Sequence, residues 1–152
     1  MIVGALNYLI CTTRPDISFV VGVLSQFLNN PGIKHWEASI CVLQYLQGSK
    51  NVTLKIFGSQ NPELLEAFTD GDWGNCENSR RSISGYIIKW NGSLMSWKSK
   101  KQSTVACSTS QAQYQAILEV VKEITWMKIL FKKIFSLNFK VLQFSSNITE
   151  FT

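Results

Sequence analysis

The 152-residue sequence predicts an α/β fold in which a long helix packs on a mixed sheet. Three observations carry this prediction. Residues 1–60 have the periodicity of helices, residues 64–106 are rich in β-forming segments, and a helical period returns after Ser108. Helices, then strands, then one long helix and a last strand form the element order of an α/β sandwich with a mixed sheet.

The first 60 residues are expected to form buried helices. The segment DISFVVGVLSQFLNN has Asp16 as a candidate N-cap, is apolar on nearly every face, and ends before Pro31-Gly32. We expect the next helix, HWEASICVLQYLQG, to stop with Gly48 as the residue beyond its last turn. The side chains that this helix should bury share helical spacing: Trp36, Ile40, Leu43 and Leu46.

Strand-like alternation follows, and it is clearest around Asn91-Gly92, the dipeptide preferred in type I′ hairpin turns. We expect the segments on both sides of this dipeptide to pair as an antiparallel hairpin. The other segments expected to form strands are VTLKIF at 52–57, LLEAFTD at 64–70, STVAC at 103–107 and FKVLQF at 139–144.

A long helix is expected from about residue 109 to 135, packed on this sheet. Ser108 or Thr109 can cap it, because their hydroxyl oxygens accept hydrogen bonds from the first free amides of a helix. The residues expected in its apolar stripe are Ile117, Leu118, Val121, Ile124, Phe131 and Ile134.

The composition is that of a globular protein, with 45% hydrophobic residues, 16% charged residues and a net charge of +5. The four cysteines and the single histidine, His35, have no zinc-site spacing, so free thiols in a reducing compartment are expected. The N-terminal segment lacks the basic start of a signal peptide, and no apolar run approaches the ~20 residues that span a bilayer. We therefore expect an intracellular protein, cytoplasmic or nuclear, that is not secreted and does not enter a membrane.

Two carboxylates follow the apolar run in the segment AFTDGDWGN. A strand that ends in Asp70, with Gly71 next and Asp72 beyond, would deliver oxygen ligands to the edge of a sheet. Hard cations such as Mg²⁺ bind such oxygens, usually together with substrate phosphates. The alternative is an Asp-Gly turn whose carboxylates are simply solvated.

Basic residues flank the expected hairpin and alternate with hydroxyl and aromatic side chains. Such a surface is suited to phosphate contacts, although an ordinary polar sheet face has the same composition. The candidate nucleic-acid-binding residues are Arg80, Arg81, Lys98, Lys100 and Lys101.

The chain to about residue 147 resembles the C-terminal end of the Pol polyprotein of copia-type LTR retrotransposons. TRPDISFVV and LSQFLNNPGIKHWEASICVLQYLQGS are similar to the motifs that follow the reverse transcriptase palm in that family. TDGDWGN, RRSISGY and SWKSKKQSTVACSTSQAQY are similar to its ribonuclease H motifs. The resemblance implies a helical reverse transcriptase connection segment at 1–58 and a ribonuclease H-like domain at 59–152 that lacks the C-terminal part of the fold.

In that family, acidic residues hold two Mg²⁺ ions that activate water against the RNA strand of an RNA–DNA hybrid. The resemblance places Asp70 at the first acidic position, as the surviving catalytic and metal-binding acid. Gln113 and Ser146 stand at the other two acidic positions, and Gln111 replaces a further glutamate. Its implied partners are the hybrid and the rest of the Pol polyprotein.

A glutamine oxygen brings no charge to a metal site and a serine hydroxyl is a poorer ligand still, so stable binding of two Mg²⁺ ions is not expected. The sequence therefore predicts a Pol remnant without catalysis. Two alternatives stay open. One is a weakly active ribonuclease H that uses Asp70, Asp72 and another acid such as Glu77 or Glu119. The other is a non-catalytic module that binds nucleic acid or a protein partner.

Overall fold

The computed structural model describes residues 2–58, 64–74, 76, 79–136 and 140–145. The chain divides into two compact units, Met1–Leu54 and Lys55–Thr152, which we call the first and the second unit. The assignment of 1–58 to a connection segment and of 59–152 to a ribonuclease H-like domain stays a prediction. Within the described helices, none has the length and apolar content needed to cross a membrane.

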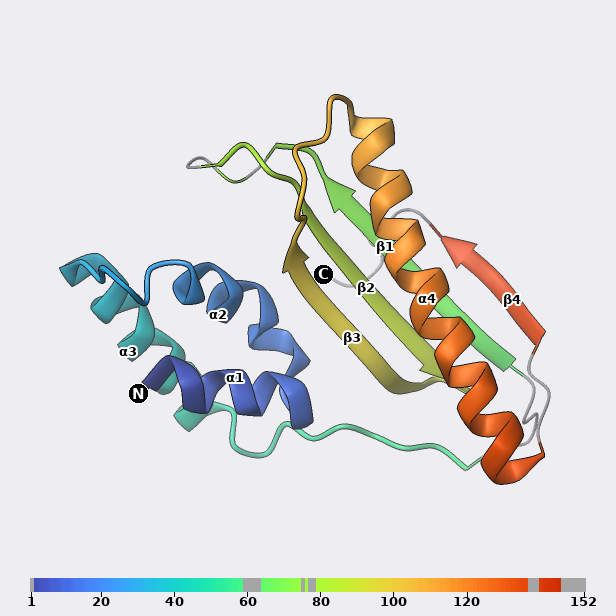
Figure 1. Ribbon diagram of the computed structural model, residues 1–152. Helices are drawn as coiled ribbons and strands as arrows, with labels where there is room; N and C mark the ends of the chain where they lie inside the picture. The colour runs from blue at the N-terminus through green and yellow to red at the C-terminus, as the bar shows by residue number, and fades with distance from the viewer. Residues whose placement is uncertain (1, 59–63, 75, 77–78, 137–139, 146–152) are drawn as a thin grey trace. The chain divides into compact units, whose positions relative to one another are not determined.

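The first unit is helical, as expected (Figure 1). Its elements are α1 (Ile2–Thr12), the 3-10 helix η1 (Pro15–Ile17), α2 (Ser18–Ser25) and α3 (Ile33–Gly48). These elements share one apolar core, formed by Leu6, Ile17, Val21, Leu24 and Val42.

The segment predicted as one buried helix from Asp16 differs from the prediction in three ways. Its first residues form η1, and Ile17 rather than Asp16 occupies the N-cap position of α2. The Asp16 carboxylate instead accepts hydrogen bonds from Arg14. α2 ends at Ser25, and the chain continues as turns. Only one side of α2 is buried, so Phe19 is exposed, as is Leu28 in the turns that follow.

α3 exists as predicted, but it buries a neighbouring face. Trp36 and Leu43 are exposed, whereas Ser39 and Val42 are buried. The prediction was wrong because aromatic and aliphatic residues lie on several sides of this helix, and contact with α1 and α2 selects only one of them. Gly48 is the last helical residue rather than the one that follows the helix.

The second unit contains a mixed four-stranded sheet in the order β3-β2-β1-β4. The strands are β1 (Leu64–Asp72), β2 (Ile83–Trp90), β3 (Ser93–Lys101) and β4 (Lys140–Ser145). β1, β2 and β3 are antiparallel neighbours, and β4 runs parallel to β1. The predicted hairpin is confirmed: Asn91 and Gly92 have φ angles of 50° and 75°, the left-handed values that a type I′ turn requires.

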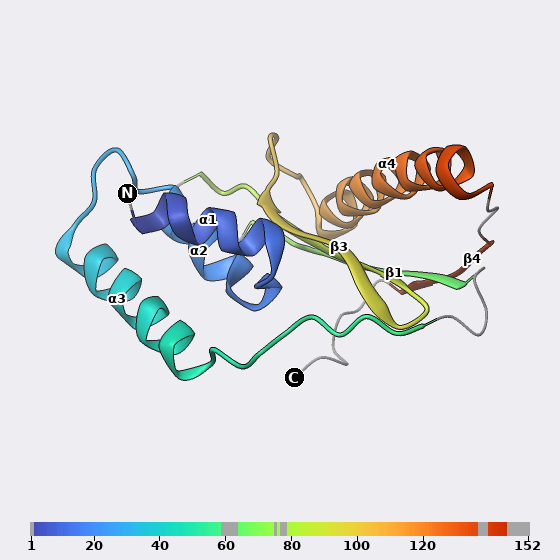
Figure 2. The same ribbon diagram turned by 90° about the horizontal axis from the view of Figure 1, so that it is seen from below.

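The 27-residue helix α4 (Thr109–Phe135) packs on one face of this sheet, as predicted (Figure 2). Ser108 is its N-cap, and its hydroxyl accepts a hydrogen bond from the Gln111 amide. The core between helix and sheet contains Leu65, Ala67, Tyr86, Ile88, Val120, Ile124, Met127 and Phe131. A mixed sheet with a long helix packed on it is compatible with a ribonuclease H-like fold.

The predicted apolar stripe of α4 is correct only in part. Ile124 and Phe131 are buried, whereas Leu118, Val121 and Ile134 are exposed. The first half of α4 instead meets the sheet through small and β-branched residues, namely Ala112, Ala116 and Val120. Small side chains let the helix approach β1 closely, so the largest residues of this half are turned outward.

Two of the predicted strands are not present. Residues 52–57 have no regular secondary structure, and the Phe57 amide donates to the Ser93 hydroxyl rather than to a neighbouring strand. The ladder of β3 ends at Lys101, so residues 103–107 are a loop. Alternation alone predicted both strands, but a strand also needs a partner backbone to satisfy its amides and carbonyls.

Candidate functional site

The end of β1 and the first turn of α4 meet at Gly71. A Cβ atom at this position would lie 2.6 Å from the Ala112 carbonyl oxygen and 3.1 Å from the Gln113 amide nitrogen. Real Cβ atoms are not found so close to backbone, so only glycine permits this approach. The backbone at the end of β1 is therefore in direct contact with the backbone at the start of α4.

The carboxylates of this corner lie on β1. Asp70 and Asp72 are exposed, and the Asp70 Oδ1 atom accepts a hydrogen bond of 2.9 Å from the Gly71 amide. Leu65, Ala67 and Thr69 are buried on the side of the sheet that α4 covers. Because side chains alternate along a strand, both carboxylates project toward the opposite face.

The two glutamines of the helix start have different environments. The Gln111 Oε1 atom accepts a hydrogen bond of 2.7 Å from the Cys107 amide, so this side chain helps to cap the helix. Gln113 is exposed, and within the described residues no hydrogen bond joins it to Asp70. Ser146 lies outside the described residues, so its predicted place in the site stays a prediction.

The described donors at this corner are not a good fit for two Mg²⁺ ions, which need several carboxylates to offset their charge. Within the described part of the chain, no three His, Cys, Asp or Glu side chains gather closely enough to hold a metal ion. Glu119, one of the substitute acids considered above, forms an ion pair with Lys122 instead. Glu77, the other, is outside the described residues.

The five predicted nucleic-acid-binding residues fall into two groups. Lys98, Lys100 and Lys101 line a groove between the sheet and α4, which we call the β3–α4 groove. Arg80 and Arg81 lie between β1 and β2 and are exposed, and they are not among the lining residues of the groove. The Lys101 Nζ atom lies 3.8 Å from the sulfur of Cys76 in this β1–β2 segment.

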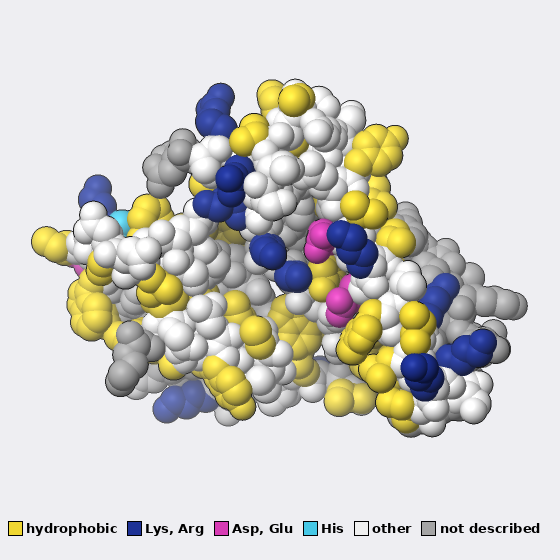
Figure 3. All heavy atoms as spheres, viewed as in Figure 1, with side chains coloured by type: hydrophobic (Ala, Val, Ile, Leu, Met, Phe, Trp, Pro, Cys, Tyr) yellow, Lys and Arg dark blue, Asp and Glu magenta, His cyan; other side chains and the backbone are white. Residues whose placement is uncertain are grey.

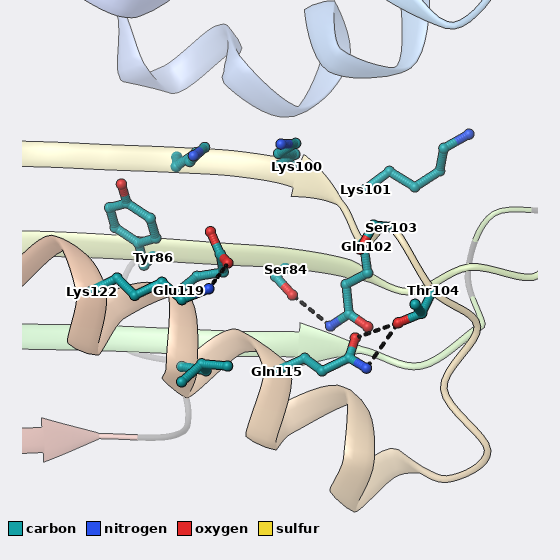
Figure 4. A pocket seen from close by; sticks show the side chains of 12 residues that line it. Ser84, Tyr86, Lys100, Lys101, Gln102, Ser103, Thr104, Gln115, Glu119 and Lys122 are labelled. Atoms are coloured by element: carbon teal, nitrogen blue, oxygen red, sulfur yellow. Dashed lines mark hydrogen bonds and ion pairs between the residues drawn. The ribbon is translucent and has the colours of Figure 1, made fainter.

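The β3–α4 groove has a volume of about 300 Å³ (Figure 4). Its lining contains four lysines against one glutamate, and most of its other side chains are polar. The lining residues are Ser84, Tyr86, Lys98, Lys100, Lys101, Gln102, Ser103, Thr104, Gln115, Leu118, Glu119 and Lys122. In the space-filling view, basic and acidic side chains lie close together on this part of the surface (Figure 3).

The charges of the groove interact with one another. The Lys122 ammonium lies 3.1 Å from the Glu119 carboxylate. This hydrogen bond, together with the nearby ammonium groups of Lys98 and Lys100, holds the pKa of Glu119 below its ordinary value. The groove therefore keeps a net positive charge at neutral pH.

Gln102 joins the floor of the groove to the helix. Its Nε2 atom donates to the Ser84 hydroxyl at 2.6 Å and to the Ala112 carbonyl at 2.9 Å. Sequence reasoning missed Gln102 and also the helical lining, including Gln115 and Lys122. The spacing of Gln115, Glu119 and Lys122 was the available signal, because residues four and seven apart share one face of a helix.

Comparisons with known proteins identify relatives over most of the chain. The Secreted RxLR effector protein 161 of Plasmopara viticola is 43% identical over 127 residues, which cover 84% of this chain and 89% of that protein. The retrovirus-related Pol polyprotein from transposon TNT 1-94 of Nicotiana tabacum is 44% identical over 126 residues. The corresponding polyprotein from transposon RE1 of Arabidopsis thaliana is 38% identical over 128 residues.

The chain belongs to the same sequence family as these relatives, and its similarity to the two polyproteins supports a retrotransposon Pol origin. In both polyprotein matches, the aligned residues make up 83% of this chain. They make up only 9% of the TNT 1-94 polyprotein and 8% of the RE1 polyprotein. No family model matches the sequence, and no solved structure matches the chain. The retrotransposon Pol origin expected from the motifs is thus confirmed, while the copia-type assignment stays a prediction.

Proposed function

We propose that the second unit is a ribonuclease H-like domain of copia-type Pol origin that has lost metal-dependent RNA cleavage and still binds nucleic acid weakly. The Mg²⁺ ions of the family would not be held stably by this chain. The helical first unit corresponds, in this proposal, to the connection segment that follows the reverse transcriptase palm.

The observation that carries the proposal is the corner at Gly71. The first turn of α4 contacts the end of β1 there. The residues at the start of α4 that stand, by resemblance, where the family has glutamates are Gln111 and Gln113. Gln111 is engaged in capping the helix. Gln113, whose amide nitrogen lies against Gly71, has an exposed and uncharged side chain. Uncharged oxygens do not offset the four positive charges of two Mg²⁺ ions.

A cleavage assay tests the catalytic part of this proposal. A labelled RNA–DNA hybrid is incubated with Mg²⁺ or Mn²⁺ and either the parent chain or Asp70→Asn, which lacks the surviving acid. The parent chain should cleave the hybrid no faster than the variant does. Metal-dependent cleavage that Asp70→Asn abolishes would instead identify the chain as a weakly active ribonuclease H and overturn the loss of activity.

A restoration experiment tests the residues assigned to the lost site. If the side chains at positions 113 and 146 reach Asp70, Gln113→Glu combined with Ser146→Asp creates carboxylates that repel one another without metal, so the melting temperature should fall slightly. Added Mg²⁺ or Mn²⁺ should then raise the free energy of unfolding by about 2.7 kcal/mol at a metal concentration near a hundred times Kd. Gln111→Glu with Ser146→Asp is the matched control, since residues 111 and 113 do not share a helix face. An equal metal response in the parent would show that the assignment is wrong.

The binding part rests on the basic residues around the sheet and is tested separately. Association with nucleic acid should be weak and should decrease steeply with salt, because phosphate contacts release counterions. Binding at low salt should be lost when the five basic residues become alanine, namely Arg80, Arg81, Lys98, Lys100 and Lys101. Binding that is undetectable, or unchanged in this variant, would contradict the proposal.

A further inference from the structure

The β3–α4 groove has unpaired positive charge on its sheet side. Lys98 and Lys100 are two residues apart on β3, so both ammonium groups project from the same face of the sheet. Both side chains are exposed, and the ion pairs found among the described residues involve neither of them. An anion in the groove would therefore meet two ammonium groups that form no direct ion pair, although both lie near enough to Glu119 to lower its pKa.

The helix side of the groove adds a third ammonium group, that of Lys122, which is engaged in an ion pair. Lys122 is exposed and paired with Glu119, which lies three residues earlier on the same helix. An exposed pair of this kind is weak, so an incoming phosphate can compete with the carboxylate for Lys122. Glu119 is the only carboxylate among the lining residues, and it opposes binding of an anion.

An exposed aromatic ring continues the same face of α4. Trp126 follows Lys122 by four residues and therefore lies one helical turn further along the groove side of the helix. Its exposed fraction is 57%, and it is not part of the core that joins α4 to the sheet. A positively charged groove beside an exposed aromatic ring is the combination by which proteins hold single strands of nucleic acid, since phosphates meet the cations and bases stack on the ring.

We propose that the β3–α4 groove binds a single strand of nucleic acid, with phosphates against Lys98, Lys100 and Lys122 and a base stacked on Trp126. This inference rests on the nucleic-acid binding in the proposed function and adds the residues of α4 that hold the strand. An acidic peptide would satisfy the lysines but would give Trp126 no base to stack on. Stacking on aromatic rings tolerates any base, so little sequence preference is expected.

The test is fluorescence anisotropy with a labelled single strand of about twenty nucleotides, longer than the roughly 4–16 nucleotides that single-strand-binding modules cover. Trp126→Ala should raise Kd about fivefold to tenfold, which is the lower end of the usual contribution of one stacked base and suits an exposed ring. Trp36→Ala is the matched control, because Trp36 also has an exposed fraction of 57% and lies in the first unit. Both truncated side chains are exposed, so both variants should melt close to the parent.

Charge changes on α4 test the phosphate contacts. Lys122→Gln should raise Kd severalfold and reduce the magnitude of the slope of log K against log salt by about 0.7, the value for one phosphate of a single strand. Lys132→Gln removes the same charge from an exposed position of the same helix and should change neither. Glu119→Gln should lower Kd, because it removes the carboxylate that competes for Lys122.

The outcomes separate this inference from the proposed function. If the parent binds neither the single strand nor an RNA–DNA hybrid at low salt, both fail, whereas binding of the hybrid alone contradicts only this inference. If the parent binds, but the Trp126 and Lys122 variants match their controls, the groove assignment alone is wrong. Polyglutamate and the unlabelled strand can be compared as competitors at equal charge concentration. If polyglutamate displaces the labelled strand equally well, the surface binds anions in general and the assignment is wrong.

Discussion

The first unit is connected by a polar network that joins distant parts of its sequence, whereas the second unit is organised by a helix that lies directly on a sheet. In the first unit, the Arg14 guanidinium donates to Asp16 and to both the hydroxyl and the carbonyl oxygen of Ser49, at the end of α3. The Tyr45 hydroxyl donates to the same Asp16 carboxylate. In the second unit, the contact at Gly71 brings backbone against backbone.

This difference matters because, among the described residues, the apolar core of the first unit has five buried members and that of the second has eight. Tyr8, Ile33 and Trp36 in the first unit are more than half exposed, and its buried core is drawn from short helices. A buried guanidinium that makes five hydrogen bonds to four acceptor atoms fixes the helices where apolar burial alone does not. In the second unit, the close approach of α4 to β1 fixes the helix on the sheet. Removal of each feature should therefore affect one unit only.

The largest effect is expected from Arg14→Ala. It removes the contacts to Asp16 and Ser49 and leaves a partly buried carboxylate without its cation, which should cost about 3 kcal/mol of the free energy of unfolding. Amide hydrogen exchange should show this loss in α1, α2 and α3, and should leave β1, β2 and β3 unchanged. Equal loss of protection in both units would contradict the separation drawn here.

A smaller effect is expected from Gly71→Ala in the second unit. Its Cβ would overlap the Ala112 carbonyl, so α4 or β1 must shift, at a cost of about 2 kcal/mol. Gly85→Ala is the matched control, because Gly85 pairs with Asp70 and its added Cβ would have only an ordinary contact of 3.8 Å. Thermal melting and exchange in α4 should distinguish the two variants. If Gly85→Ala lowers the free energy of unfolding as much as Gly71→Ala does, the loss comes from replacing a glycine in a strand and not from the close approach of α4.

The smallest effect is expected from Asp16→Asn in the first unit, and this effect should depend on pH. Hydrogen bonds from Arg14 lower the pKa of Asp16, so this carboxylate contributes stability that is present above its unfolded pKa of about 3.9 and is lost as pH falls through the lower folded value. Asp16→Asn should therefore cost about 1 kcal/mol at neutral pH, and the difference from the parent should shrink below about pH 4. A difference that is the same at neutral and acid pH would show that the charge of Asp16 is not responsible.

The local elements that the sequence predicted correctly have causes contained within a few residues. Asn91-Gly92 makes the hairpin turn because both positions need left-handed backbone, and Ser108 starts α4 because its hydroxyl accepts from the Gln111 amide. The structure places the backbone of Gly71 against the start of α4, whereas the Asp70 carboxylate projects toward the other face of the sheet, so a site shared by Asp70 and Gln113 stays a prediction. By contrast, residues 52–57 alternate like a strand and yet pair with no other strand.

The sequence by itself determined the order of helices and strands, the hairpin and the retrotransposon Pol origin, because periodicity, turn residues and motifs are properties of short stretches of chain. Only the tertiary structure decided which face of α3 and of α4 is buried, since several faces are apolar and contact selects among them. It also decided that Lys98 and Lys100 share a groove with Lys122, while Arg80 and Arg81 do not line it. Lysines on a strand and a lysine on a helix become neighbours only when α4 packs across the sheet, and no local pattern contains that contact.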